Sequence, residues 1–448
     1  GMLSDISAQD FSLQADTLNE ARLPAQWDLQ SCIDYALEQN ITIRKNRVTA
    51  ESTQIDVKTA KAALFPSLSF STSQQVVNRP YQETSSRVSG SEIISSNSKT
   101  SYNGNYGLNA SWTIYNGSKR LKTLKQERLN NQVAELDVAT SENMIKESIA
   151  QIYIQILYAA ESVRVNENTL QVSIAQRDRG QELLNAGSIA KSDFAQLEAQ
   201  VSTDRYQLVT AQATLQDYKL QLKQLLELDG ENEMNVYLPK LSDENVLAPL
   251  PAKKDVYVSA LAIRPEIEAS KLNVEASELG IDIAKSSYFP TISLSAGIGT
   301  NHTSGSDFTF GEQVKNGWNN SIGLSVSVPI FNNRQTKSAV QKAKLQRETD
   351  MLSLLDEQKA LYKTIESLWL DANSAQQRYA AANEKLRSTQ ISYDLISEQF
   401  NLGMKNTVEL LTEKNNLLQA QQEQLQAKYM AILNTQLLKF YQGDKLTL

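Results

Sequence analysis

The feature that most constrains this chain is a set of four very long stretches that contain neither glycine nor proline. These stretches cover residues 118–179, 188–229, 332–402 and 404–442. Glycine and proline are the residues that most often end a helix, and the stretches are rich in strong helix formers. A helix of roughly 65–70 residues reaches about 100 Å, which is too long for a compact domain. The sequence therefore predicts two extended helical hairpins that turn at Gly187 and Gly403.

The chain also contains two copies of one plan. Ala60–Ser69 recurs as Ala284–Ser293, and Leu184–Gly187 recurs as Phe400–Gly403. Each copy is predicted to contain a helix, two alternating strands joined by a polar loop, and a long helical hairpin. The expected organisation is an N-terminal extended segment (1–26), a first repeat (27–232; strands about 66–76 and 104–115, hairpin 118–229), an inter-repeat linker in the equatorial region (233–254), a second repeat (255–442; strands about 290–300 and 320–331, hairpin 332–442) and a C-terminal tail (443–448).

The second helix of each hairpin carries a heptad pattern. In the first hairpin the pattern runs from Phe194 to Leu225, and Asp204 is its one polar member. In the second it runs from Val408 to Ile432, with Asn415 and Gln422 in the seam. A sustained period of 3.5 residues indicates helices that pack side by side with a left-handed supercoil. These moderately apolar seams favour a layer of many neighbouring helices over an isolated two-stranded coil.

The four predicted strands alternate apolar residues with Ser, Gly, Asn and Thr. Each is about ten residues long, which is the length that a tilted strand needs to cross a bilayer. Aromatic residues gather at the helix–strand junctions, as an interfacial girdle requires. The predicted girdle residues are Phe65, Tyr115, Tyr288, Phe289 and Phe331. Since four strands cannot close a barrel, closure requires several subunits.

Composition excludes several classes of protein. The net charge is −7, with one Cys and one His, so the chain has neither a disulfide framework, nor a Cys/His metal site, nor a basic surface for nucleic acid. His302 is expected in a Ser/Gly-rich loop, where it cannot supply both a metal cluster and a catalytic base, so we expect no enzyme and no cofactor. Cys32 is expected to be a buried, small apolar residue. We expect a signal peptide to precede the printed Gly-Met-Leu start.

The order of these elements, and short motifs that occur twice, resemble the outer-membrane efflux family, the TolC-like channel-tunnels. The motifs are Phe65-Pro66 and Phe289-Pro290 before strands, Pro329-Ile330-Phe331-Asn332 after the last strand, and Ala186-Gly187-Ser188 and Leu402-Gly403-Met404 at the hairpin turns. The likeness extends from about Trp27 to Tyr441. It implies a mostly α fold with a small transmembrane β part. In this fold a homotrimer forms a twelve-stranded β-barrel that continues into a periplasmic α-helical barrel.

The resemblance also implies a function. Relatives are outer-membrane channels of tripartite efflux or export systems in Gram-negative bacteria, with a long periplasmic extension. Their partners are a periplasmic adaptor (membrane fusion) protein, an inner-membrane pump of the RND, ABC or MFS type, and outer-membrane lipid. The substrate class stays open among drugs, bile acids, metals and secreted polypeptides. An alternative is a soluble periplasmic coiled-coil adaptor or scaffold, which predicts one hairpin and a Gly-rich β-domain.

By the same resemblance, two sets of residues gain a role. The periplasmic gate corresponds to Asp193, Phe400, Lys405, Glu409 and Thr412, and the adaptor-contacting hairpin tips to Ala186, Gly187, Ser188, Leu402, Gly403 and Met404. Three copies of Glu409 would form a carboxylate ring that draws cations. Lys405 is expected to pair with an acidic neighbour such as Asp193. Thr412 is a departure from the best-studied member of the family, where a second acidic ring is expected at this position.

Overall fold

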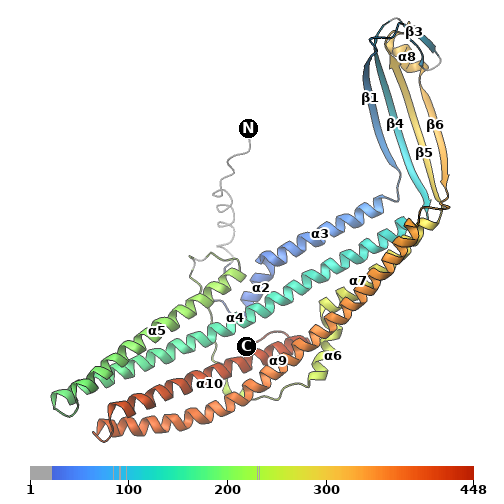
Figure 1. The fold of residues 1–448 in the computed structure, drawn as a ribbon. Helices are drawn as coiled ribbons and strands as arrows, with labels where there is room; N and C mark the ends of the chain where they lie inside the picture. The colour runs from blue at the N-terminus through green and yellow to red at the C-terminus, as the bar shows by residue number, and fades with distance from the viewer. Residues whose placement is uncertain (1–22, 84, 90–91, 97, 230, 232) are drawn as a thin grey trace. The chain divides into compact units, whose positions relative to one another are not determined.

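The computed structural model of the chain describes residues 23–83, 85–89, 92–96, 98–229, 231 and 233–448 (Figure 1). Most of the expected N-terminal segment, residues 1–22, lies outside the described residues. The chain forms two compact units, and each draws residues from both halves of the sequence. We call them the hairpin unit (Gly1–Val48, Leu136–Glu268 and Asp356–Leu448) and the strand unit (Thr49–Glu135 and Ala269–Leu355).

Helices make up most of the described chain, as the sequence predicts. Their bounds are α2 Leu29–Gln39, α3 Ile41–Ala62, α4 Lys119–Asn185, α5 Lys191–Leu225, α6 Lys253–Ile263, α7 Pro265–Lys285, α8 Phe310–Asn316, α9 Gln335–Asn401 and α10 Thr407–Gln442, with short 3₁₀ turns η2 Asp243–Asn245 and η3 Ser286–Tyr288. The two longest, α4 and α9, have 67 residues each. They confirm that the stretches without glycine and proline form continuous helices.

A single non-helical residue separates the short helix from the longer one that follows it in each repeat. Asn40 stands between α2 and α3, and Arg264 stands between α6 and α7. The Asn40 side chain accepts hydrogen bonds from the backbone N–H groups of Thr42 (3.0 Å) and Ile43 (3.3 Å). It therefore caps the first turn of α3, whose N–H groups have no partner within the helix. Pro265 begins α7, where its missing N–H costs no helical hydrogen bond.

The strand unit contains a four-stranded antiparallel sheet in the order β1-β4-β5-β6. The strands are β1 Ser67–Asn78, β4 Thr100–Asn116, β5 Thr291–Thr303 and β6 Asn319–Ser327. The register places Ala110 of β4 between Leu68 of β1 and Ala296 of β5. Because side chains alternate along a strand, this register brings the apolar positions of all four strands to one face.

The last strand is shorter than the sequence analysis expects. β6 ends at Ser327, although the expected strand continues to about residue 331. Ser327 pairs with Thr291, which is the first residue of β5, so the residues after Ser327 have no ladder partner on that side. Pro329 also lacks the N–H group that a continuing ladder needs.

The joining segments contain structure where polar loops are expected. The first holds a two-stranded hairpin, β2 Ser85–Ser89 with β3 Glu92–Ser96, and the second holds α8. α8 begins with a capping box: Glu312 N donates to Thr309 Oγ1 (3.3 Å), and Thr309 N donates to Glu312 Oε2 (2.8 Å). This reciprocal pair stabilises the start of a helix too short for hydrophobic periodicity to predict.

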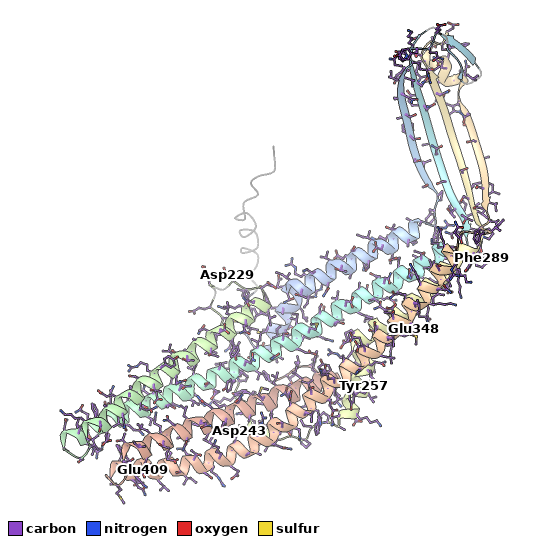
Figure 2. All side chains as sticks on the ribbon, viewed as in Figure 1. Asp229, Asp243, Tyr257, Phe289, Glu348 and Glu409 are labelled. Carbon is purple, nitrogen blue, oxygen red and sulfur yellow. The ribbon has the colours of Figure 1, made fainter. Side chains whose placement is uncertain are left out.

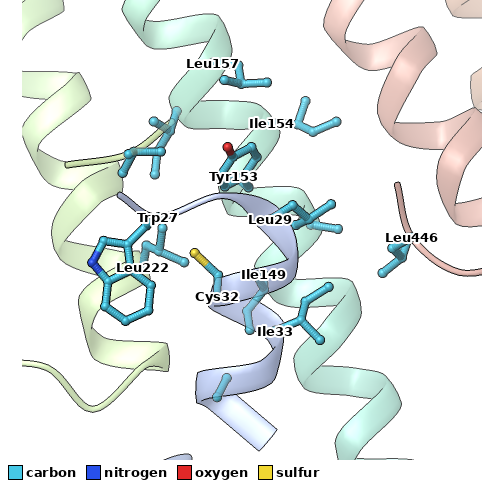
Figure 3. Packing of buried hydrophobic residues seen from close by; sticks show 14 of the residues in the cluster. Trp27, Leu29, Cys32, Ile33, Ile149, Tyr153, Ile154, Leu157, Leu222 and Leu446 are labelled. Carbon is cyan, nitrogen blue, oxygen red and sulfur yellow. The ribbon is translucent and has the colours of Figure 1, made fainter. Parts of the chain in front are cut away.

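The main core of the hairpin unit gathers segments that lie far apart in the sequence (Figure 3). Trp27 and Cys32 pack with Tyr153 of α4, Leu222 of α5 and Leu446 of the C-terminal tail. The Cys32 side chain is fully buried, and this burial raises the pKa of its thiol to about 12. The prediction that Cys32 is a small core residue is therefore confirmed.

Candidate functional site

The four-stranded sheet has one apolar face and one polar face. On the apolar face, Phe70, Ile322 and Leu324 are 66%, 78% and 64% exposed in the single chain. The opposite face carries small polar residues that pair across the strands: Ser69, Asn109, Gly297 and Ser321 in one row, and Ser67, Ser111, Ser295 and Gly323 in another. The four strands, all within the described residues, contain no Asp, Glu, Lys or Arg. The sheet is therefore uncharged, with one apolar face and one polar face.

Both edges of this sheet are open. β1 pairs only with β4, and β6 pairs only with β5, within the described part of the chain. An open edge presents a row of unpaired backbone N–H and C=O groups, which tend to pair with another strand. A single copy of this sheet therefore leaves hydrogen bonds on two strands to be made by other strands.

The five predicted girdle residues lie at one end of the sheet. Phe65 precedes β1, Tyr115 is near the end of β4, and Phe331 follows β6, and the antiparallel order brings these positions together. Tyr288 and Phe289 precede β5, and Figure 2 shows Phe289 where the helices meet the sheet. All five side chains are exposed in the single chain. The structure thus brings the predicted set together at the helix–strand junction.

A second aromatic cluster, which the sequence analysis missed, lies at the other end of the sheet. His302 stacks on Tyr106 of β4 with ring centroids 5.7 Å apart, and meets Phe310 of α8 edge-on at 4.9 Å. Tyr102 lies 5.4 Å from the same ring. His302 is a residue of β5, so its assignment to a loop is wrong. The signal lay in the alternation, because Tyr102 and Tyr106 are in phase with the apolar residues of β4.

Three of the predicted gate residues, Lys405, Glu409 and Thr412, lie around the start of α10, where Figure 2 labels Glu409. Glu409 and Asn406 form a capping box, in which Asn406 N donates to Glu409 Oε2 (3.2 Å) and Glu409 N donates to Asn406 Oδ1 (2.9 Å). Lys405 Nζ lies 3.5 Å from Glu409 Oε1. Glu409 and Thr412, one turn apart, are both exposed in the single chain.

Lys405 and Asp193 both belong to the described residues, and the expected pair between them is not formed within the chain. Asp193 instead accepts a hydrogen bond from Ala190 N (3.3 Å) at the start of α5, while Lys405 pairs with Glu409. Each carboxylate lies in the first turn of its own helix, where unpaired N–H groups and the helix dipole favour a negative charge. Local capping therefore determines where these two acids point.

Phe400 has surroundings that differ from those of the other gate residues. Its side chain is 2% exposed and packs with Leu197 of α5, Tyr393 of α9 and Leu410 of α10. In the single chain Phe400 therefore belongs to an apolar cluster that joins the two hairpins close to their turns.

The two hairpin turns have the same backbone geometry. Gly187 and Gly403 have φ values of 75° and 76°, in the left-handed region that favours glycine. In the second turn Gly403 N donates to Phe400 O (2.9 Å) and Met404 N donates to Gln399 O (2.8 Å), and the first turn repeats this pattern. These are the bonds of a Schellman motif. The other tip residues, Ala186, Ser188, Leu402 and Met404, are exposed.

A buried ion pair lies farther along the hairpins. Lys414 Nζ of α10 contacts Asp204 Oδ2 of α5, and both side chains are 3% exposed. Ser173 Oγ of α4 also donates to Asp204 Oδ2. Burial lowers the pKa of Lys414, and the hydrogen bond to Asp204 opposes that shift. The heptad pattern marks Asp204 as the polar member of its seam, but no feature of the sequence indicates Lys414 as its partner.

The described residues contain neither a cluster of metal ligands nor a membrane-spanning helix. No group of three or more His, Cys, Asp or Glu residues is arranged to hold a metal ion in this part of the chain. None of the described helices combines the length and the apolar character needed to span a membrane.

Comparisons with known proteins identify relatives of the chain. It is similar to outer membrane efflux protein BepC of Brucella suis biovar 1 (strain 1330), with 25% identity over 65% of this chain and 61% of that protein. It is also similar to outer membrane protein TolC of Salmonella enteritidis, with 22% identity over 99% of this chain and 85% of that protein. The chain thus spans less than two thirds of the length of BepC and most of the length of this TolC.

Solved structures share the fold. The structure of CusC matches with a TM-score of 0.79 at 18% identity, over 94% of this chain and 93% of that one. VceC from Vibrio cholerae matches with a TM-score of 0.76 at 17% identity, over 94% and 97%. The sequence model described as "Outer membrane efflux protein" matches residues 32–227 and 256–443. The chain therefore belongs to the outer membrane efflux protein family.

Proposed function

We propose that this chain is the outer-membrane channel of a tripartite efflux or export system and conducts its substrates passively. The observation that carries the proposal is the two-faced, uncharged sheet with two open edges. The exposed side chains of Phe70, Ile322 and Leu324 need an apolar environment, which the hydrocarbon of a bilayer supplies. The opposite Ser, Asn and Gly face suits a water-filled bore.

Closure of the sheet requires further copies of the chain. In a homotrimer, β6 of one copy pairs with β1 of the next, and twelve strands form a closed barrel in which no strand edge faces lipid. Each of the two repeats, 27–232 and 255–442, contributes two long strands and one helical hairpin. The hairpins of three copies then form a periplasmic α-helical barrel, and the linker 233–254 lies in its equatorial region.

The aromatic residues at the two ends of the sheet support the proposal that the sheet spans the outer membrane. The girdle of Phe65, Tyr115, Tyr288, Phe289 and Phe331 contacts lipid headgroups at the periplasmic side, and the cluster around His302 lies at the outer side. On β4, Tyr106 and Tyr115 are nine positions apart, which corresponds to about 30 Å along an extended strand. A tilted strand of this length fits an apolar band about 25 Å tall.

The gate lies at the hairpin ends in this proposal. Three copies of Glu409 form a carboxylate ring that favours cations, and Lys405 beside each Glu409 reduces the field of the ring. Thr412 lies one turn farther into the bore and adds no charge. Asp193 and the buried Phe400 support the gate from the first hairpin and from the apolar cluster, respectively.

The exposed turns form the docking site for other components. Ala186, Gly187 and Ser188 at one tip, and Leu402, Gly403 and Met404 at the other, contact a periplasmic adaptor. The adaptor links the channel to an inner-membrane pump of the RND, ABC or MFS type. The chain in this arrangement belongs to the outer membrane of a Gram-negative bacterium and extends into the periplasm.

Light scattering and planar-bilayer recording test the proposal together. Detergent-purified protein is expected to have the mass of three chains and to form channels with a small, cation-preferring conductance. A stable monomer that forms no channel would overturn both the trimer and the conduit.

A further inference from the structure

We infer that Asp204 and Lys414 are positioning residues that determine the axial register of the second hairpin against the first, and so the position of the gate. The gate itself belongs to the proposed function, on which this consequence rests. The register does not depend on that function, because it follows from contacts within one chain.

The pair joins three helices from both hairpins. Asp204 of α5 accepts hydrogen bonds from Lys414 of α10 and Ser173 of α4 through Oδ2, and from Gln200 Nε2 through Oδ1 at 2.9 Å. Ser173 is itself 2% exposed. The carboxylate thus has three donors, which compensates for the loss of water around a buried charge.

The surroundings leave the two charges few alternatives. Asp204 occupies a heptad seam whose neighbouring layers are Val201 and Leu208, and Val201 is 3% exposed. A slip of α10 by one layer would place the Lys414 ammonium opposite one of these apolar side chains. A buried charge without a partner is costly, so the pair penalises every register except the observed one.

The internal duplication shows that the pair is specific to one combination of helices. At the spacing that relates Gly187 to Gly403, Asp204 corresponds to Ala420 and Lys414 corresponds to Glu198. Ala420 is fully buried and Glu198 is exposed. The pair with these two positions exchanged between the repeats does not exist. The acid is therefore carried only by α5 and the base only by α10.

Lys414 also controls the gate through the helix that carries it. Glu409 and Lys414 are little more than one turn apart in α10, which is continuous from Thr407 to Gln442. A helix is stiff over this distance, so the anchor at Lys414 sets the height and rotation of Glu409 and Thr412. The hydrogen bond between the hairpins from Gln176 Nε2 to Tyr393 Oη (2.7 Å) is uncharged, so its loss on a slip would leave no buried ion without a partner.

The test compares three double variants of the full chain. Asp204→Leu with Lys414→Met removes both charges and leaves no unpaired ion, so it is expected to fold. Asp204→Lys with Lys414→Asp exchanges the charges. Lys385→Met with Glu423→Leu is the matched control, because it also removes an ion pair (2.8 Å), but one that lies within the second hairpin. The side chains of Lys385 and Glu423 are 47% and 41% exposed.

Two measurements are made on each variant. Spin labels at Ser188→Cys and Met404→Cys report the distance between the hairpin tips, and bilayer recording reports conductance. The apolar variant is expected to shift or broaden the distance distribution by about 5 Å, the rise of one helical turn, and to raise conductance. The charge exchange and the control are expected to retain the wild-type values.

If the apolar variant has the same tip-to-tip distances and the same conductance as wild type, the inference is overturned, because the charges are then dispensable for the register. A wild-type protein without conductance would instead contradict the proposed function. The tip-to-tip distances would still decide whether Asp204 and Lys414 set the register.

Discussion

Gly104 of β4 lies directly opposite His302 of β5, and the imidazole ring covers its backbone. A Cβ atom at position 104 would lie 2.2 Å from His302 Cε1 and 2.7 Å from Gln74 Oε1. Glycine is needed here for close approach, because His302 occupies the space that a side chain would fill. The aromatic cluster of Tyr102, Tyr106 and Phe310 holds the ring in that place.

Gly104→Ala is expected to destabilise the end of the sheet by about 1–3 kcal/mol, as overpacking does. His302→Ala in the same chain should restore most of that loss, because it removes the ring that the new methyl group meets. Thermal unfolding in detergent measures the stability of wild type, of the two single variants and of the double variant. Gly323→Ala is the control on the same sheet, because the nearest atom to its Cβ would be Ser295 Oγ at 3.3 Å, so the added methyl group is less crowded than at position 104. Additive effects of the Gly104 and His302 substitutions would contradict the contact.

Arg264→Met is expected to lower stability by about 1.5–3 kcal/mol, because it removes charge-assisted hydrogen bonds to two partly buried carboxylates. Arg264 is 6% exposed, and its guanidinium contacts Glu147 (3.2 Å) and Glu266 (2.9 Å) and lies 4.1 Å from the Tyr441 ring centroid. Chemical unfolding measures the loss. Arg387→Met removes an exposed pair with Glu384 and should cost about 0–1 kcal/mol. Equal effects of the two substitutions would show that burial of Arg264 adds nothing.

Glu409→Gln is expected to weaken the cation preference of the channel without disturbing α10. Gln retains the hydrogen bond of the capping box with Asn406 but removes the charge. Glu409→Ala should weaken the preference equally and also loosen the first turn. Reversal potentials in a salt gradient measure the selectivity, and circular dichroism measures the helix. Unchanged selectivity in both variants would remove Glu409 from the constriction.

Gly403→Ala is expected to destabilise the second hairpin turn by about 1–2 kcal/mol, which is the cost of a left-handed conformation for a residue with a Cβ. A Cβ at this position would meet no atom within 4 Å, so the cost arises from the backbone alone. Gly403→Asn should recover part of the loss, because Asn tolerates this region better. Thermal unfolding of the two variants tests the difference, and equal losses would contradict the backbone explanation.

Asp28 is expected to give stability that depends on pH. Its side chain accepts a hydrogen bond from Ser31 N (2.7 Å) at the start of α2, and hydrogen bonds from Ser31 hold its pKa below the ordinary value of 3.8. The contribution is complete above pH 3.8 and is lost as the pH falls through the lower folded-state pKa. Asp28→Asn retains a cap but does not titrate. The difference in melting temperature between wild type and this variant should shrink in acid, and a constant difference would contradict the linkage.

Local patterns were enough to predict the long helices and the four strands of the main sheet, but not the short elements β2, β3 and α8. Long stretches without glycine or proline predict α4 and α9, and strict alternation predicts β1, β4 and β5, because helices and strands expose their periods directly in the sequence. The position of the five aromatic residues at one end of the sheet was also predictable, since each lies beside a strand end. β6 was predicted too long because its end depends on Thr291, a partner from another strand.

The tertiary structure decided which side chains meet. Heptad spacing marks Asp204 as an exception in its seam, but the stagger between α5 and α10 brings Lys414 to it from a distant part of the chain. The family resemblance also suggested a pair between Lys405 and Asp193, whereas Asp193 caps the start of α5 and Lys405 pairs with Glu409 at the start of α10. Period determines which face of a helix or strand is apolar. The offset between elements, which packing alone sets, determines the partner of each charge.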